Sequence, residues 1–131
     1  MPQMANVTVK AANGTTDVIY TAQTPSAGDS SPAQWSANAA STTRAYRPVI
    51  RMVSQANGPK TARRVTVTGK YPVVRDIGGV QTLVGTIPLE FSALLPNLVT
   101  DAEAQEATRQ FENFLAATLP RECIEQGFAA T

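Results

Sequence analysis

The fold is decided by a stretch that begins Arg44-Ala45-Tyr46-Arg47-Pro48-Val49-Ile50-Arg51-Met52-Val53-Ser54-Gln55, turns at Asn57-Gly58-Pro59-Lys60 and returns over Ala62 to Val74. Alternation of apolar and polar residues is typical of strands, so we expect a hairpin with strands over Arg44 to Gln55 and Ala62 to Val74. From residue 44 to residue 75 the chain holds eight of its eleven Lys and Arg residues and no Asp or Glu, which is a local net charge of +8.

The period of two divides this predicted hairpin into two chemically different faces. Ile50, Met52, Val65, Val67 and Tyr71 point to the apolar face. The opposite face carries the cations and hydroxyls: Arg47, Val49, Arg51 and Val53 from the first strand, and Arg64, Thr66, Thr68 and Lys70 from the second. Such a face suits the phosphates of a nucleic acid. The alternative is a solvated outer face that happens to be basic.

Length and composition predict one domain over residues 1–131, since a chain of this size can build a core without disulfides or metals. The overall net charge of +1 hides an asymmetry, because residues 101–125 carry six acidic residues and two Arg, a net charge of −4. A polyanionic partner should therefore meet the basic hairpin. The N-terminus has no signal-peptide pattern, and no apolar run is long enough to cross a membrane, so we expect no membrane partner.

The chain lacks His and has a single cysteine, Cys123. This composition excludes an intrachain disulfide and a Cys–His pair, and it removes the commonest general base and metal ligand. Glu90 among the cations is more readily a charge-balanced sheet residue than a general base. We therefore expect no enzyme activity, no cofactor, no metal and no small-molecule substrate.

The N-terminal third predicts a hairpin followed by a short strand. Val7 to Lys10 and Asp17 to Thr21 flank Asn13-Gly14, which is a strong turn signal. Residues 24–33 read as a loop because they are rich in Pro, Gly and Ser. Gln34 to Ala39, around Trp35, is interpreted as a third strand.

Beyond Gly78-Gly79, Leu83 to Leu95 predicts the last strand. Ile87, Leu89 and Phe91 alternate with Thr86, Pro88 and Glu90, so the first three belong to the apolar face and the others to the basic face. Pro88 removes one ladder donor, which indicates that this strand lies at an edge or is paired on only one side at that point.

The C-terminal quarter changes to a helical period. Thr100-Asp101-Ala102-Glu103 fits a capping box, and an apolar stripe follows at Ala104, Ala107, Phe111, Phe114 and Leu115. We expect helices over about Asp101 to Thr118 and Arg121 to Gln126, the second closed by Gly127. The fold class is therefore α+β, with an N-terminal β-hairpin and an antiparallel sheet of about five to seven strands followed by two C-terminal helices.

The apolar face of this sheet is larger than the expected helices can cover. A helix of about 18 residues is roughly 27 Å long and lies over only a few strands. A homodimer that exchanges helices across one continuous sheet would supply the missing cover.

At this point the chain resembles the coat proteins of the small single-stranded RNA bacteriophages, the leviviruses. The resemblance covers nearly the whole chain and rests on the order and spacing of the features above: Asn13-Gly14, the Trp35 segment, Arg44-Ala45-Tyr46-Arg47, Arg63-Arg64-Val65-Thr66-Val67 running to Tyr71-Pro72, Gly78-Gly79-Val80, and Thr100-Asp101 opening the helix.

The resemblance implies an interlocked homodimer with a continuous sheet, which assembles into an icosahedral shell around genomic RNA. It also implies that the inner sheet face binds an RNA stem-loop, so that the coat protein represses replicase translation. The expected location is the virion, assembled in the cytoplasm of the bacterial host. A non-assembling dimeric RNA-binding module is the alternative.

Carried onto this chain, the resemblance assigns RNA binding to the polar side of the sheet: Arg47, Val49, Arg51, Arg64, Thr66, Thr68, Lys70, Thr86 and Glu90. Arg and Lys would contact phosphates, and the Thr hydroxyls would bond to a base or a ribose. The chain departs from the family near Pro88 and Glu90, where several members stack a base on a Tyr.

Overall fold

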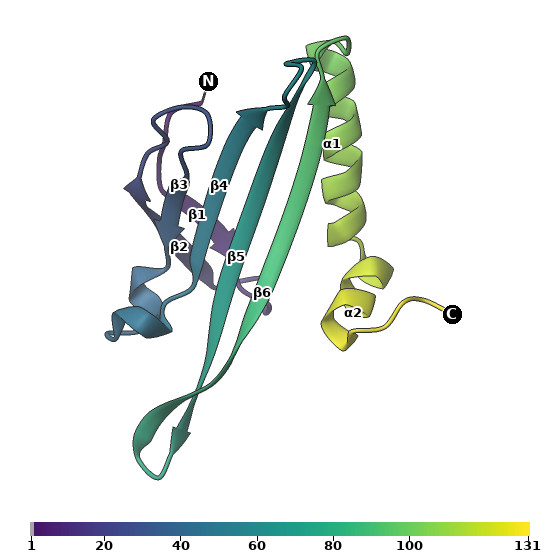
Figure 1. Ribbon diagram of the computed structural model, residues 1–131. Coiled ribbons are helices and arrows are strands. Elements are labelled where there is room, and N and C mark those ends of the chain that lie inside the picture. Colours follow the sequence, from purple (N-terminus) through teal and green to yellow (C-terminus); the bar gives the residue numbers. More distant parts are fainter. Residues whose placement is uncertain (1) are drawn as a thin grey trace. The chain divides into compact units, whose positions relative to one another are not determined.

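A computed structural model describes residues 2–131, which form two compact units, residues 2–94 and Leu95–Thr131 (Figure 1). The strands form one six-stranded sheet in which each strand pairs with the next along the chain. Two helices follow, so the predicted α+β class is confirmed. The strands are β1 (Val7–Lys10), β2 (Asp17–Thr24), β3 (Ala33–Ser36), β4 (Val49–Ala56), β5 (Ala62–Ile77) and β6 (Val80–Pro96).

The predicted N-terminal hairpin is confirmed. Asn13 builds its turn, because the side-chain Oδ1 accepts hydrogen bonds from the backbone N–H groups of Thr15 (3.0 Å) and Thr16 (2.9 Å). Gly14 has a φ of 75°, a left-handed conformation that glycine adopts without strain. An ion pair between Lys10 and Asp17 closes the base of the turn.

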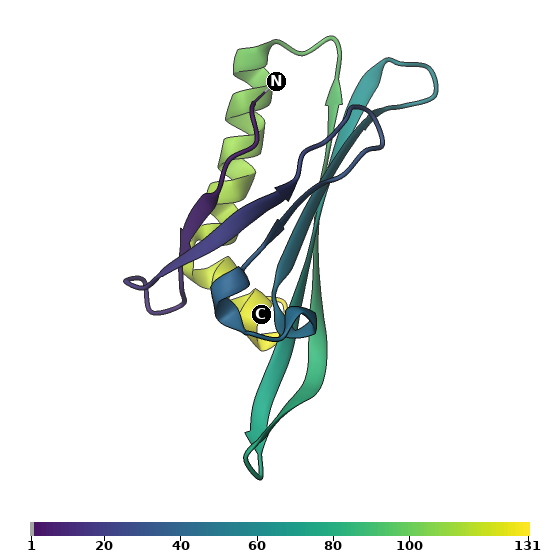
Figure 2. The ribbon, with the colours of Figure 1, turned by 90° about the vertical axis from the view of Figure 1, so that its left-hand side faces the viewer.

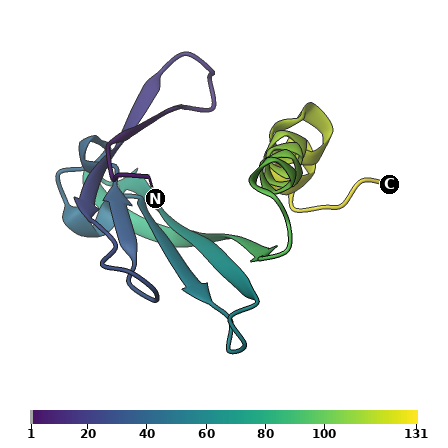
Figure 3. The same cartoon turned by 90° about the horizontal axis from the view of Figure 1, so that it is seen from above.

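The sheet is curled at its N-terminal end. Figure 3 shows the β1–β2 hairpin bent away from the plane of β4 and β5. The bend coincides with a register shift between Ala22 and Thr24, and such irregularities increase the local twist of a strand. The curl brings the half-buried Tyr20 close to Tyr71. Burial is the main cause that raises the pKa of Tyr20, and the neighbouring Tyr71 phenol raises it further.

The strand predicted from Arg44 is wrong over its first five residues. Arg44–Tyr46 forms a short 3₁₀ turn, η2, and β4 begins only at Val49. The cause is local, because Pro48 has no N–H and the hydroxyl of Ser41 accepts a hydrogen bond from the N–H of Thr43 (3.1 Å), which favours a turn. The strand predicted over Gln34 to Ala39 likewise ends at Ser36, and a second 3₁₀ turn, η1 (Asn38–Ala40), follows.

Strands β5 and β6 form a long hairpin around Gly78 and Gly79, whose φ angles are 61° and 82°. Figure 2 shows this hairpin extending beyond the start of β4. Pro72 is tolerated inside β5 because the β4–β5 ladder ends at the pair Val49↔Lys70, before the proline. β6 is the last strand of the sheet, which confirms the edge position predicted from Pro88.

The second unit consists of α1 (Asp101–Ala116) and α2 (Thr118–Gln126). The predicted capping box is present, since the Thr100 hydroxyl accepts from the Glu103 N–H (3.2 Å) and the Glu103 carboxylate accepts from the Thr100 N–H (3.4 Å). Pro120 lies in the first turn of α2, which begins three residues earlier than predicted. Gly127, with a φ of 78°, ends that helix as expected.

Very little of the described chain is buried. Only four of residues 2–131 are buried, namely Ser36, Ala37, Pro48 and Ala62, and neither helix has a buried residue. In the predicted apolar stripe of α1, Ala104 and Leu115 are half-buried, whereas Phe111 is exposed to 51% and Phe114 to 59% of their maximal accessibility. Leu89 of the sheet is exposed to 54%. Each unit by itself therefore leaves large apolar side chains exposed.

A loop over residues 25–32 docks on the end of the β4–β5 hairpin. Asp29 forms an ion pair with Arg63 and accepts a hydrogen bond from the N–H of Ala56 (3.4 Å). Ser30 donates its N–H to the carbonyl of Ser54 (2.9 Å) and its hydroxyl to Gln55 (3.0 Å). The hydrogen bond from Arg63 lowers the pKa of Asp29 below its ordinary value of 3.8.

Replacing Thr100 with Ala should destabilise α1 by about 1 kcal/mol, because the substitution leaves N-terminal N–H groups without their cap. The free energy of unfolding, measured in urea at fixed protein concentration, tests this expectation. Thr100→Ser keeps the hydroxyl and should behave as the wild type. Equal losses in the Ala and Ser variants would contradict the capping role.

Replacing Asp29 with Asn should reduce the loss of stability at acid pH. A lowered carboxyl pKa means that the Asp29–Arg63 pair stabilises the fold above pH 3.8 and that this contribution is lost as the pH falls through the lowered pKa. Unfolding experiments between pH 2 and 6 measure the difference. Asp76→Asn is the matched control, since Asp76 forms no ion pair within residues 2–131. Identical pH profiles for the Asp29→Asn variant and the wild type would show that the pair does not hold the loop.

Candidate nucleic-acid interface

The pairing of β4 with β5 defines one polar face of the sheet. Directly opposite residues share a face, and the register pairs Val49 with Lys70 and Arg51 with Thr68. Two further pairs continue the same face toward the turn, Val53 with Thr66 and Gln55 with Arg64. We call this set the basic face: Val49, Arg51, Val53, Gln55, Arg64, Thr66, Thr68 and Lys70.

Strand β3 extends the basic face in the other direction. Gln34 pairs with Arg51 and Ser36 pairs with Val49, so both side chains lie on the face of the cations. The predicted site residues do not include Gln34, Ser36 or Gln55. The alternation of Gln34 and Ser36 around the apolar Trp35 is the signal that could have placed them.

Strand β6 contributes to the same face through its even-numbered residues. A Cβ atom built on Gly69 would lie 3.6 Å from the Cβ of Leu89, which is possible only if both positions face the same side. Gly69 is paired with Ile50 on the apolar face. Leu89 is therefore apolar-facing, and the period of two places Pro88, Glu90 and Thr86 beside the basic face.

The cations of the basic face are available for a ligand. Arg51, Arg64 and Lys70 are exposed, and within residues 2–131 none of them forms an ion pair. Arg63, the sequence neighbour of Arg64, differs because it is paired with Asp29, which raises the pKa of the guanidinium. Arg64 therefore lies on the basic face without an ion pair in residues 2–131, whereas Arg63 is paired with Asp29 of the 25–32 loop.

The spacing of these cations favours an extended ligand. Arg64 and Lys70 are six residues apart on one strand, which is roughly 20 Å. The hydroxyls of Thr66 and Thr68 lie between them, and Arg51 stands opposite Thr68. A small phosphate compound cannot reach both ends of this row, whereas a polyanion with hydrogen-bonding groups between its charges can.

Arg47 does not lie on the strand as predicted. It precedes β4, and its guanidinium donates hydrogen bonds to the carbonyls of Ser41 (2.8 Å, from Nε) and Thr42 (3.4 Å). These bonds tie Arg47 to the segment between β3 and β4. Its side chain lines a hollow together with Val49, so it borders the basic face instead of projecting from it.

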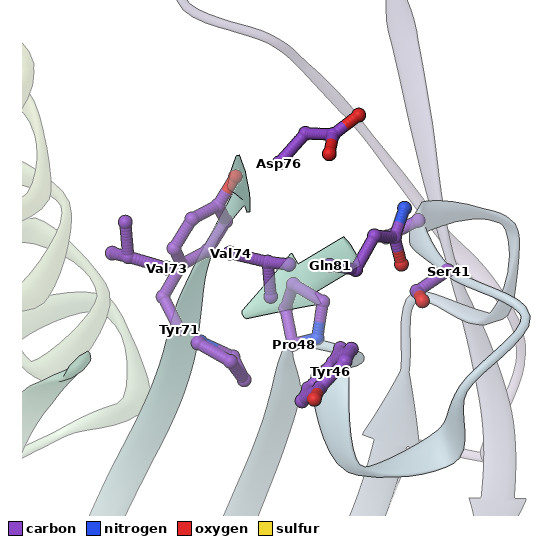
Figure 4. A pocket seen from close by; sticks show the side chains of 10 residues that line it. Ser41, Tyr46, Pro48, Tyr71, Val73, Val74, Asp76 and Gln81 are labelled. Carbon is purple, nitrogen blue, oxygen red and sulfur yellow. The ribbon is translucent and has the colours of Figure 1, made fainter. Parts of the chain in front are cut away.

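A second hollow lies where β5 continues past the start of β4. Figure 4 shows Tyr46 beside Pro48, with Tyr71, Val74 and Gln81 among the other lining residues. Aromatic rings and prolines suit a peptide segment better than a phosphate. Asp76 is the acidic residue among those lining this hollow.

No group of three or more His, Cys, Asp or Glu side chains that could bind a metal occurs among residues 2–131. Cys123 is half-buried in α2. None of the helices within this range is long and apolar enough to span a membrane.

Sequence comparison identifies no relative, since no protein-family model matches the chain and no curated protein matches it significantly. Solved structures do match over the full length. The virus-like particle of Beihai levi-like virus 21 aligns with a TM-score of 0.81 and 16% identity, covering 99% of both chains. The virus-like particle of bacteriophage NT-214 aligns with a TM-score of 0.82 and 15% identity, covering 99% of this chain and 100% of the other.

The capsid protein of bacteriophage GA also aligns, with a TM-score of 0.74 and 15% identity over 95% of both chains. The order of six strands and two helices is thus shared from end to end. The predicted RNA-phage coat fold is confirmed.

Proposed function

We propose that the chain is the coat protein of an RNA bacteriophage, which forms homodimers that assemble into an icosahedral shell. The observation that carries this proposal is the uncovered apolar surface of a chain whose fold matches phage capsid proteins along its whole length. We also propose that residues 1–131 form a single coat protein domain, as the length and composition predict. In this proposal, a second copy of the chain covers the exposed apolar side chains and completes the core.

The dimensions of the elements support the need for a second copy. β5 has 16 residues and is roughly 50 Å long, and six strands are roughly 24 Å across. α1 has 16 residues and is roughly 24 Å long and 10 Å wide. One such helix covers about two strands over half their length, wherever it packs. The helices of two chains on one continuous sheet cover more of the apolar face.

We propose further that the basic face lines the interior of the shell and binds the genomic single-stranded RNA. Support comes from the row of exposed cations and Thr hydroxyls, and from the sequence, in which these cations and the acidic residues of the helices belong to different segments. Binding of an RNA stem-loop at this face would repress replicase translation. The virion is the proposed location, with assembly in the cytoplasm of the bacterial host.

Expression of the chain alone in bacteria tests the assembly proposal. Size-exclusion chromatography, electron microscopy of the void peak and its ultraviolet absorbance ratio would show whether closed shells containing RNA form. A dimer that binds RNA but never closes would favour the non-assembling RNA-binding module. A monomer without RNA would overturn the proposal.

Replacing Phe114 with Ala should prevent dimerisation. Truncation of a core aromatic costs about 3–5 kcal/mol, and Phe114 belongs to the apolar stripe that we propose the second copy covers. Analytical ultracentrifugation checks the oligomeric state. Asn113→Ala, on the opposite side of α1, should dimerise normally. Intact particles from the Phe114→Ala variant would show that this stripe is not the interface.

Replacing Arg64 and Lys70 with Ala should weaken RNA binding at low salt. Each lost phosphate contact should reduce the slope of log affinity against log salt concentration by about one. Filter binding at several salt concentrations measures the slope. Arg109→Ala removes a charge from α1 and should leave the slope unchanged. An unchanged slope in the double variant would place the RNA on another surface.

A further inference from the structure

Two hairpin turns of the sheet each contain an asparagine followed by a glycine. Asn13-Gly14 lies between β1 and β2, and Asn57-Gly58 lies between β4 and β5. In such a pair the nitrogen of the glycine can approach the side-chain amide of the asparagine, because glycine has no Cβ atom to hinder it. Open space surrounds both glycines, since a Cβ atom built on either would meet no heavy atom within 4 Å apart from those of its chain neighbours. Crowding therefore does not distinguish the two turns.

The side chains of the two asparagines are held in closely similar ways. Oδ1 of Asn13 accepts hydrogen bonds from two backbone N–H groups (3.0 and 2.9 Å), and its Nδ2 donates to the Thr16 hydroxyl (2.7 Å). Oδ1 of Asn57 likewise accepts from two backbone N–H groups (2.8 and 3.2 Å), and its Nδ2 donates to the Thr61 hydroxyl (3.0 Å). In both turns the two N–H donors would stabilise the negative charge that develops on Oδ1 when a nucleophile adds to Cγ.

The two turns differ at the nitrogen that would attack. The N–H of Gly14 donates a hydrogen bond to the carbonyl of Ala11 (2.9 Å). The N–H of Gly58 makes no hydrogen bond to any of residues 2–131, and Gly58 is exposed. A base in the solvent can therefore take the proton of Gly58 directly, whereas Gly14 must first give up a hydrogen bond.

We propose that Asn57 is a site of spontaneous deamidation in the folded protein and that Asn13 is protected from the same reaction. Hydroxide takes the proton of the Gly58 N–H, and this nitrogen forms a bond to Cγ of Asn57. The bond between Cγ and Nδ2 then breaks, and Nδ2 takes a proton from water and leaves as ammonia, so that a succinimide ring remains. Water opens the ring at one of its two carbonyl carbons. Opening at Cγ gives aspartate, and opening at the backbone carbonyl carbon gives isoaspartate.

The two products differ in their effect on the turn. In aspartate a carboxylate oxygen takes the place of Oδ1 and accepts the same N–H groups of Thr61 and Ala62. In isoaspartate the backbone passes through Cβ and Cγ, so the turn is one atom longer and the carboxylate sits directly on Cα. Isoaspartate therefore alters the turn that joins β4 to β5. Either product adds a negative charge to the stretch from residue 44 to residue 75, which has no acidic residue.

Incubation of the purified full-length protein in mildly alkaline buffer, with and without urea, tests the proposal. Trypsin releases the two asparagines in separate peptides, residues 11–44 and 52–60, so mass spectrometry follows both sites in one sample. In the folded protein Asn57 should deamidate at least about fivefold faster than Asn13, because Gly14 keeps its hydrogen bond. In urea the two rates should converge, since both turns are lost. A higher pH should accelerate the reaction at Asn57, because the nitrogen attacks after losing its proton.

Gly58→Ala is the matched variant, because it keeps the backbone N–H and adds a Cβ atom into open space. It should slow the loss of Asn57 and leave the rate at Asn13 unchanged, and circular dichroism confirms that the variant is folded. None of these measurements depends on RNA binding or on assembly.

Three results would each overturn the proposal. Equal rates at the two sites in the folded protein would show that the hydrogen bond of Gly14 gives no protection. Faster loss of Asn13 than of Asn57 would reverse the assignment. Retention of Asn57 in the folded protein, over a period in which the urea-denatured chain loses it, would show that the turn protects this asparagine.

Discussion

The register between β4 and β5 is the constraint on which the rest of the structure depends. A slip of one residue would exchange the two faces of a strand and place Arg51 among the apolar side chains. The turn prevents such a slip, because Oδ1 of Asn57 accepts hydrogen bonds from the N–H groups of Thr61 (2.8 Å) and Ala62 (3.2 Å). Asn57 and Ala62 also share a backbone bond of 3.0 Å. The docked loop at residues 25–32 holds the same end of the hairpin.

With this register in place, one layer of backbone separates two different chemical environments. The face of Ile50, Met52 and Val67 needs apolar cover, and the opposite face needs water or a polyanion. A monomeric protein would bury the first face under its own helices. The two helices are too small to cover all of that face, and Phe111 and Phe114 of their own apolar stripe are exposed as well. These exposed apolar side chains are the surface that the proposed second copy would cover.

Charge follows the same division. The stretch from residue 44 to residue 75 carries a net charge of +8, and residues 101–125 carry −4. On the basic face, Arg64 forms no ion pair with any of residues 2–131, while Arg63 neutralises Asp29, which is the single acidic residue of the 25–32 loop. Two neighbouring residues of β5 thus have different surroundings: Arg63 is paired with the docked loop, and Arg64 is available for the proposed polyanion.

The local sequence pattern was sufficient to predict much of this structure. The period of two in Ala62 to Val74 separates Thr66 from Val67 in any sheet, and the capping box at Thr100 involves only residues three apart, so both were predictable from the sequence. The place of the last strand at the edge also followed from one residue, Pro88. The assignment of Arg47 to a strand failed because Pro48 and the Ser41 hydroxyl favour a turn that the alternation does not reveal.

Only the tertiary structure decided which strands face one another, and therefore which distant residues share a surface. Gln34 joins Arg51 because β3 pairs with β4 across a connection of twelve residues, whose length does not determine a register. Ser36 is buried, and Gln23 reaches Asn38, because the curl of the sheet brings β2, β3 and η1 together. Sequence spacing alone specifies which residues of one strand share a face. A surface built from several strands depends in addition on hydrogen bonds between residues far apart in the chain.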